Sequence, residues 1–198
     1  MQPEQERTSL GFADAVLSAF AFLIKDFSFR CVKRDVTFVR FESDTVFVNV
    51  YHGRASYELN VEIGESVIGK QLPESPFTIG EILHTVIPTE ALNYRPYQVT
   101  TRESVQKFVH ELARLVKEYA TPALLGDHEF FQRVSKVQAQ RSDNYLRGLH
   151  LSRTRTEVET AWRQKNYTRV IELYDSIKDD LTPTEVKKLE YATKHATR

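Results

Sequence analysis

The chain has 198 residues, 41% of them apolar and 27% charged, so a folded core is expected and a largely disordered chain is excluded. Its 27 basic and 27 acidic residues cancel, which excludes a protein that coats nucleic acid or an anionic membrane with its whole surface. The single cysteine, Cys31, excludes a disulfide scaffold and a multi-thiolate zinc site.

No apolar run is long enough for a membrane span, because a spanning helix needs about 20 apolar residues. The first ten residues, MQPEQERTSL, are polar and lack the apolar stretch of a secretory signal. We therefore expect a soluble, cytoplasmic protein that does not insert into a membrane.

Two patterns of apolar residues begin the chain. From Phe12 to Phe27 the apolar positions fall on one helical face without Gly or Pro, which predicts a helix over 12–27. Residues 31–63 are instead rich in Val, Phe, Tyr and Thr, which favour strands. With turns at Ser43-Asp44 and His52-Gly53, this stretch predicts a three-stranded antiparallel meander over 32–42, 45–51 and 54–63.

The two turns imply a register for the meander. Pairing Glu42 with Thr45 and Tyr51 with Arg54 divides the side chains between the two faces of the sheet. The inner face, which we expect to pack on helices, holds Val39, Phe41, Val46, Val48, Val50, Tyr57, Leu59 and Val61. The outer face holds a polar and aromatic set: Phe38, Arg40, Glu42, Phe47, Asn49, Tyr51, Arg54, Ser56, Glu58, Asn60 and Glu62.

Capping patterns place the helices that follow. Thr78 with Glu81 and Thr100 with Glu103 form Thr-x-x-Glu boxes, in which the hydroxyl and the carboxylate bond free backbone N–H groups at a helix start. They predict a short helix and a longer one whose apolar residues form one stripe at 105, 108, 109, 112, 116 and 119. Asp127 is predicted to cap a further helix. The fold class is therefore α+β, with helices packed on the meander.

The last third is predicted to be helical. Residues 140–153 are polar and basic and indicate a partly helical linker after an α+β domain over 1–139. Thr154 with Glu157 and Thr182 with Glu185 form two more capping boxes. They predict helix starts in an all-helical hairpin tail over 154–198.

Part of this tail resembles a known repeat. The stretch AWRQKNYTRVIELYDSI, from Ala161 to Ile177, is similar to the second half of a tetratricopeptide repeat. Tyr167, Tyr174 and the later Pro183 match its aromatic positions and its closing proline, while Val170 and Ile177 replace alanines. The match covers about 35 residues and occurs once. The resemblance implies a helical hairpin, and a single repeat does not form a binding groove. The first 130 residues resemble, in layout only, small bacterial α+β domains, some of which are toxin-immunity proteins.

The neutral total hides an asymmetry. Residues 1–126 carry 13 basic and 16 acidic residues, whereas residues 127–198 carry 14 and 11. The excess is concentrated in 133–155, where only Asp143 is acidic before Arg155 and the cations are Arg133, Lys136, Arg141, Arg147, Arg153 and Arg155. This basic stripe is either a solvated helix surface or a docking surface for an acidic protein or for RNA. It lacks the aromatic motifs of an RNA-binding sheet.

No motif with catalytic chemistry occurs in the sequence. Phosphate-binding glycine loops, His-Glu-x-x-His and the Gly-x-Ser-x-Gly elbow are absent. Asp127, His128 and Glu129 are adjacent, so on a helix they point in different directions and do not predict a metal site. We expect neither a metal nor a cofactor.

The strongest candidate for a functional surface is the outer face of the predicted sheet. It carries charged and aromatic anchors of the kind found at protein interfaces: Arg40, Phe47, Tyr51, Arg54, Glu58 and Glu62. The alternative is that a helix, the tail or water covers this face. Glu58 and Glu62 lie about 14 Å apart along one strand, which is too far for an acid/base pair.

We therefore predict a non-enzymatic protein-interaction module, a bacterial immunity, inhibitor or adaptor protein. It would bind another protein through the sheet face or the basic stripe. Two alternatives stay open. One is an enzyme whose site assembles around Cys31, His52 and Glu58, in which nearby cations would lower the pKa of the Cys31 thiol. The alternative role of Cys31 is that of a small buried apolar residue. The other is an RNA-binding protein that uses residues 133–155.

Overall fold

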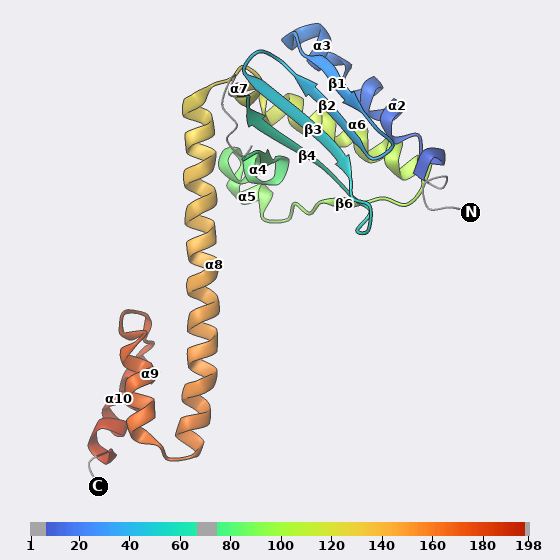
Figure 1. Ribbon diagram of the computed structural model, residues 1–198. Coiled ribbons are helices and arrows are strands. Elements are labelled where there is room, and N and C mark those ends of the chain that lie inside the picture. The colour runs from blue at the N-terminus through green and yellow to red at the C-terminus, as the bar shows by residue number, and fades with distance from the viewer. Residues whose placement is uncertain (1–6, 67–74, 197–198) are drawn as a thin grey trace. The chain divides into compact units, whose positions relative to one another are not determined.

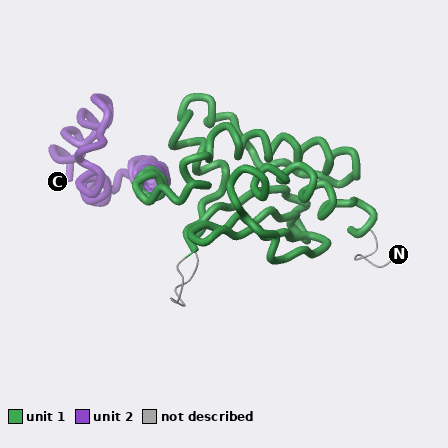
Figure 2. The backbone as a smooth tube through the Cα atoms, turned by 90° about the horizontal axis from the view of Figure 1, so that it is seen from above, with its two compact units in different colours: residues 1–138 green, residues 139–198 purple. Residues whose placement is uncertain are grey.

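The computed structural model describes residues 7–66 and 75–196, and the chain runs from a sheet-containing part into a helical part (Figure 1). It divides into two compact units between Gln138 and Ala139 (Figure 2). Unit 1 ends at Gln138 and contains an antiparallel sheet with helices, whereas unit 2 begins at Ala139 and is all helical. Each unit has its own cluster of buried apolar residues. The fold class is α+β, as the sequence predicts.

The described part of unit 1 contains a six-stranded sheet. Its strands are β1 (Arg30–Arg34), β2 (Phe38–Glu42), β3 (Val46–His52), β4 (Glu58–Glu65), β5 (Phe77–Thr78) and β6 (Tyr97–Gln98). All pairs are antiparallel in the order β1-β2-β3-β4-β5, and β6 also pairs with β4. The predicted meander is present as β2, β3 and β4.

The predicted first strand, 32–42, is a hairpin rather than one strand. It turns between β1 and β2, where the backbone N–H of Asp35 donates to the carbonyl of Phe38 at 2.7 Å. The Asp35 carboxylate accepts from the N–H of Val36 at 2.6 Å. Asp is a frequent turn residue because its side chain bonds nearby backbone in this way, and this local bond closes the turn.

The predicted register was wrong, whereas the predicted faces were right for the residues that lie in β2, β3 and β4. Val48 pairs with Phe41 on one side and with Ile63 on the other, instead of Val39 and Tyr57. The strands are thus displaced by two and by six residues from the predicted pairing. Both displacements are even numbers, and side chains alternate with a period of two, so each strand keeps the predicted residues on its inner face.

The connection between β3 and β4 accounts for the larger displacement. It runs over residues 53–57 instead of closing as a two-residue turn. Arg54 and Ser56, predicted on the outer face, lie exposed in this connection. Tyr57, predicted on the inner face, is also there, with a positive φ of 54°.

Helices cover the inner face of the sheet. They are α2 (Phe12–Ala19), α3 (Ala21–Phe27) and α6 (Arg102–Tyr119), which lie behind the sheet in Figure 1. The inner side chains of β2, β3 and β4 are fully buried: Val39, Phe41, Val46, Val48, Val50, Leu59, Val61 and Ile63. The predicted helix 12–27 breaks at Phe20, whose φ of −93° and ψ of 12° are not helical. Its buried ring stacks on Phe41 with 6.3 Å between ring centres.

The remaining helices of unit 1 follow the predicted capping chemistry with one shift. Thr78 and Glu81 form the capping box of α4 (Ile79–Val86), which α5 (Pro88–Ala91) follows. The box of α6 is formed by Thr101 and Ser104, one residue later than predicted. After α7 (Thr121–Leu124), Asp127 caps the next helix as predicted, because its Oδ1 accepts from the N–H of Phe130 at 3.0 Å.

Unit 2 is built from the later part of α8 (His128–Arg163), α9 (Tyr167–Asp175), a short 3₁₀ helix (Lys178–Asp180) and α10 (Pro183–His195). The helix start predicted at Thr154 is wrong, since α8 is continuous and buries Thr154 in its interior. The linker predicted over 140–153 lies entirely within α8, because no proline interrupts the helix before Arg163. Thr182 and Glu185 do form the capping box of α10. All side chains from 139 to 150 are exposed.

Candidate functional site

The outer face of the sheet collects most of the predicted binding residues. Alternate side chains of β2, β3 and β4 point to this face. The register places Phe47 opposite Gly64, Asn49 opposite Glu62 and Tyr51 opposite Asn60. The structure thereby brings together Arg40, Phe47, Tyr51, Glu58 and Glu62 on one face. It does not bring Arg54 to them, because Arg54 lies in the β3–β4 connection.

On β3 and β4, the outer face is a half-buried layer of polar groups that bond to one another. Asn49 and Asn60 are only 7% and 4% exposed. The Glu62 carboxylate accepts hydrogen bonds from Tyr51 and Asn49. The side-chain amide of Asn60 donates to Glu58 at 3.2 Å. Since these groups already satisfy one another, little hydrogen-bonding capacity is left for a partner.

Burial sets the acid–base behaviour of this layer. Burial, followed by the charges of Glu62 and Glu58, raises the pKa of Tyr51 to about 12. Burial also raises the pKa of Glu62, to which the nearby Glu81 carboxylate adds. Tyr94 is affected in the same direction, and its hydroxyl is buried without a hydrogen-bond partner in the described residues. At neutral pH, Tyr51 and Tyr94 therefore remain protonated and present no nucleophile.

One stack of side chains separates this layer from the open part of the face. The guanidinium of Arg40 lies 4.1 Å from the ring centre of Phe47 and donates from Nε to Glu42 at 2.5 Å. The ring of Phe47 is fully buried and lies over Gly64, where a Cβ would come within 2.5 Å of the ring. Glycine at this position therefore allows the ring to lie flat on β4.

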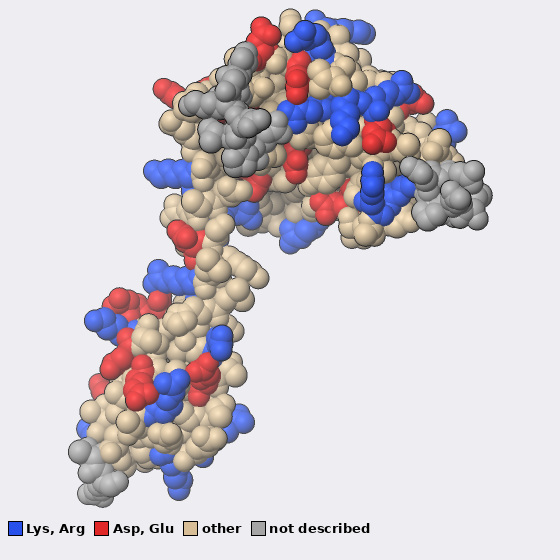
Figure 3. Space-filling model, in the orientation of Figure 1, with Lys and Arg blue, Asp and Glu red and all other residues tan. Residues whose placement is uncertain are grey.

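On β1, the edge of the outer face is exposed and cationic, whereas the outer side chains of β2, Phe38, Arg40 and Glu42, are half-buried. Arg30 and Lys33 are exposed on β1, and between them the side chain of Val32 is 48% exposed. The ammonium of Lys33 lies 5.2 Å from the ring centre of Phe38 on β2. Figure 3 views the sheet from this side and shows Lys and Arg side chains in a row across β1 and β2. We call Arg30, Val32, Lys33 and Phe38 the β1 patch.

The three residues of the predicted enzyme site do not meet. In the register of the sheet, Cys31 of β1 lies at the same height as Val48 of β3, which is two strands away. His52 lies four residues beyond Val48 along β3. At about 4.8 Å between strands and 3.4 Å per residue, their backbones are about 17 Å apart. Glu58 belongs to the outer face, whereas His52 is on the inner one and 1% exposed. Among the described residues, no group of three His, Cys, Asp or Glu side chains is arranged to hold a metal.

Half of the predicted basic stripe is neutralised within unit 2. Arg147 pairs with Asp180 at 2.5 Å, Arg155 with Glu185 at 2.7 Å and Arg153 with Glu157 at 3.3 Å. The bond from Arg155 lowers the pKa of Glu185 to about 2. The pKa values of Arg147 and Arg155 rise for the matching reason. In unit 1, Arg133 lies over the ring of Phe130 at 5.4 Å. Lys136 and Arg141 are exposed and have no ion-pair partner within the part of the chain described.

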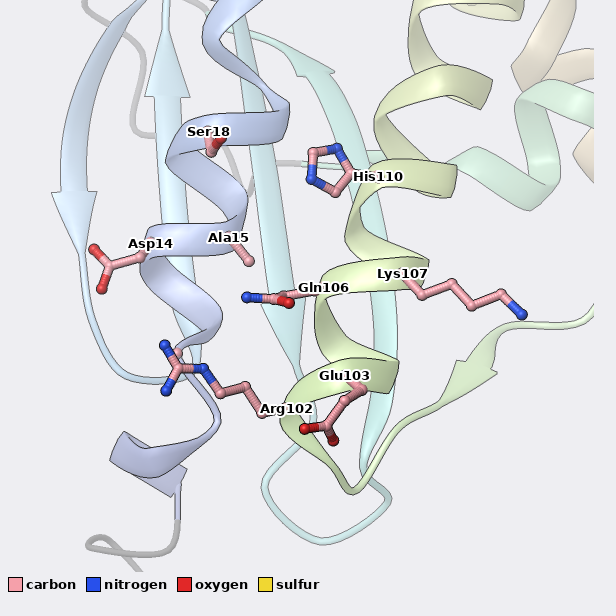
Figure 4. Close-up of a pocket in the computed structure, with 9 residues that line it drawn as sticks. Asp14, Ala15, Ser18, Arg102, Glu103, Gln106, Lys107 and His110 are labelled. Atoms are coloured by element: carbon pink, nitrogen blue, oxygen red, sulfur yellow. The ribbon is translucent and has the colours of Figure 1, made fainter.

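A hollow of about 520 Å³ lies between α2 and α6. In Figure 4, Gln106 and His110 of α6 point toward α2, whereas Lys107 points away. Asp14, the acid on its α2 side, already pairs with Arg34 at 2.5 Å. Its side chains carry both signs of charge and are mostly exposed, so the hollow favours no particular ligand.

Sequence reasoning missed two groups of residues. The sequence identifies the cations of the β1 patch only as neighbours of Cys31, because the hairpin that exposes them was not predicted. Arg7 was missed altogether, although it is buried and bonded to His52. No local pattern signals that contact, which joins residues 45 positions apart.

Two further observations concern membrane-spanning helices and similarity to known proteins. Among the described helices, none combines the length and apolar character needed to cross a membrane. No protein-family model, curated protein or solved structure matches the chain.

Proposed function

We propose that the chain is a non-enzymatic protein-interaction module that binds an acidic protein partner through the β1 patch. Such a module would act in the cytoplasm as an immunity, inhibitor or adaptor protein. The observation that carries this proposal is the contrast between the two parts of the outer face. The polar groups of β3 and β4 are bonded to one another, whereas Arg30, Val32 and Lys33 remain exposed.

The chemistry of the β1 patch suits a protein interface. Arginine and aromatic side chains are enriched at such interfaces, and two cations beside an apolar residue match a partner with carboxylates around an apolar anchor. The sheet beneath is rigid, because β2 and β3 are paired on both sides and their inner side chains are fully buried. A rigid scaffold lowers the ordering cost of binding.

A second surface is favoured by one observation on α8. Residues 139–150 are exposed and include three large apolar side chains, Tyr145, Leu146 and Leu149, at 67%, 62% and 50% exposure. Exposed apolar side chains that lie together on a helix are typical of helix-docking surfaces. Arg141 lies one turn before them, which keeps the basic stripe as an alternative site for a protein partner.

Charge reversal distinguishes the two surfaces. The variant Arg30→Glu with Lys33→Glu changes the β1 patch, and the matched variant Lys136→Glu with Arg141→Glu makes the same charge change on α8. All four residues are exposed, so both variants are expected to fold. The protein is captured with its partner by cross-linking from lysate with and without nuclease treatment, and the partner's affinity for each variant is then measured.

The proposal expects the β1-patch variant to bind the partner at least about tenfold more weakly. Each of the two charge pairs lost at the rim of the interface contributes part of this loss. The α8 variant is expected to bind as the unchanged protein does. The opposite pattern transfers the function to α8. If both variants bind the partner as tightly as the unchanged protein does, the protein-binding proposal is contradicted for both surfaces. If the partner is lost on nuclease treatment, the ligand is RNA.

A further inference from the structure

Arg7 is a buried cation at the beginning of the described chain, with 9% of its surface exposed. Its Nη1 lies 3.1 Å from Nδ1 of His52 and donates to the carbonyl of Gly53 at 3.1 Å, while Nη2 donates to the carbonyl of Arg54. The guanidinium also lies 4.2 Å from the ring centre of Tyr57. These contacts hold it against the β3–β4 connection in one orientation.

None of these contacts supplies a negative charge. The Nε2–H of His52 donates to the carbonyl of Val99 at 2.8 Å, which leaves Nδ1 as the acceptor for Arg7 and the ring neutral. Burial, with a smaller contribution from Arg7, holds the pKa of His52 below its ordinary value. Within the described residues, no carboxylate forms an ion pair with Arg7. A buried charge without a counter-charge is strongly unfavourable.

The carboxylates of the neighbouring hollow are already bonded to other groups. This hollow, of about 360 Å³, is bordered by Arg7, Asp14 and Asp35 among others. Asp14 accepts from Arg34 at 2.5 Å, and Asp35 accepts from the backbone N–H of Val36 at 2.6 Å. Neither of them neutralises Arg7.

A second hollow, of about 400 Å³, has a lining that favours an anion. It is formed by Arg7, Ser9, Leu10, Tyr57 and Thr100, with no acidic side chain among these lining residues. Thr100 lies two residues before α6, and the dipole of that helix attracts negative charge, while the N–H groups of Thr101 and Ser104 are already bonded within the capping box. A guanidinium, hydroxyl groups and a helix start therefore surround one space.

We propose that this hollow, the Arg7 pocket, binds a compact oxyanion of the phosphate type. A guanidinium has five N–H donors, and the contacts above engage only three of them, so two remain for the oxyanion. Its planar arrangement matches two phosphate oxygens, and the Thr100 hydroxyl adds a hydrogen bond. Bound phosphate neutralises the buried charge and so stabilises unit 1. This site does not depend on the protein-binding proposal, since none of its residues belongs to the β1 patch.

The test measures the unfolding temperature against the concentration of inorganic phosphate, with sodium chloride keeping the ionic strength constant. A saturable rise is expected, because a ligand that binds only the folded state stabilises it. Arg7→Gln is expected to weaken phosphate binding about tenfold or more, as the loss of a charged hydrogen bond predicts. Arg141→Gln, which removes an exposed cation of α8, is expected to leave the response unchanged.

A second pair of variants decides the question if Arg7→Gln does not fold. Thr100→Glu places a carboxylate beside Arg7, so it is expected to raise the unfolding temperature without phosphate and to abolish the phosphate response. Thr100→Gln, a neutral control of equal size, is expected to keep a response. The proposal is overturned if the unchanged protein shows no saturable rise in unfolding temperature with phosphate; a rise that does not saturate is the effect of an adventitious ion only. It is also overturned if Thr100→Glu responds to phosphate as the unchanged protein does.

Discussion

Replacing Gly64 with alanine tests the stack formed by Phe47 and Arg40 on the outer face of the sheet. A Cβ at this position would lie 2.5 Å from Cζ of Phe47, 2.8 Å from its Cε1 and 3.2 Å from Cα of Pro76. The first two distances are far below van der Waals contact, so the ring must move. The ring is fully buried and covered by Arg40 at 4.1 Å, so moving it also disturbs that contact.

The expected cost is the sum of two effects. Extra volume in a well-packed site costs about 1–3 kcal/mol. Loss of the contact between Arg40 and the Phe47 ring adds about 0.5–1 kcal/mol. We therefore expect Gly64→Ala to lower the free energy of unfolding of unit 1 by about 1.5–4 kcal/mol, a large part of the stability of a typical domain.

Urea unfolding followed by far-ultraviolet circular dichroism measures this change. The matched control is Gly148→Ala, because a Cβ at Gly148 has nothing within 4 Å and alanine is favoured over glycine inside a helix by about 1 kcal/mol. The same substitution is thus expected to destabilise unit 1 at Gly64 and to stabilise α8 at Gly148. Fluorescence of Trp162, the single tryptophan, reports the control because this residue belongs to unit 2.

A smaller side chain opposite Gly64 provides the second check. Phe47→Leu relieves the crowding, so the double variant is expected to recover about 1–2 kcal/mol relative to the sum of the two single changes. The reasoning is refuted if Gly64→Ala costs less than about 0.5 kcal/mol, the range of ordinary surface substitutions. It is also refuted if Phe47→Leu recovers nothing.

Three further changes test the polar groups of the two units. Tyr51→Phe removes a donor to Glu62, so unit 1 is expected to lose about 1 kcal/mol and the pKa of Glu62 to rise further, which a carbon-detected NMR titration of its carboxyl group measures. The pKa of His52 is lowered from 6.5 in the folded state, so below pH 6.5 the unfolded chain binds a proton that the folded chain excludes. The stability of unit 1 is therefore full above pH 6.5 and falls below it. His52→Gln should flatten this dependence of the urea midpoint on pH. The pKa of Glu185 falls from 4.5 to about 2, so its contribution is present above pH 4.5 and is lost toward pH 2. Glu185→Gln should remove that acid-dependent loss from the Trp162 fluorescence, and an unchanged acid transition would contradict the role of this pair.

The faces of the sheet were predictable from sequence, whereas the pairing of its strands was not. Alternation with a period of two assigns Val46, Val48 and Val50 to one face, whatever the partner strand is. Register depends on the length of the connections, and residues 53–57 contain no signal that distinguishes a five-residue connection from a two-residue turn at Gly53. The candidate face was therefore identified, but the residues that remain open on it were not.

Contacts between distant residues set the remaining limits. Arg147 and Arg155 appear as free cations in the sequence because their partners, Asp180 and Glu185, lie 33 and 30 residues further along the chain. Thr154 failed as a helix start for a different reason. A Thr-x-x-Glu pattern caps a helix only where the preceding turn is absent. Here the backbone N–H groups of Thr154 and Glu157 already donate to carbonyls of the preceding turn of α8.

The exposed stretch of α8 has a consequence for how the chain breaks. Residues 139–150 place no side chain in either apolar core, so their helix is supported mainly by its own hydrogen bonds and by the pair between Arg147 and Asp180. An isolated helix of about 12 residues is marginal in water, and Gly148 weakens it further. We therefore expect amide hydrogens of α8 to exchange fastest in this stretch, and trypsin to cut α8 here first, after Arg141 or Arg147. Such a cut would yield two folded fragments, one for each core.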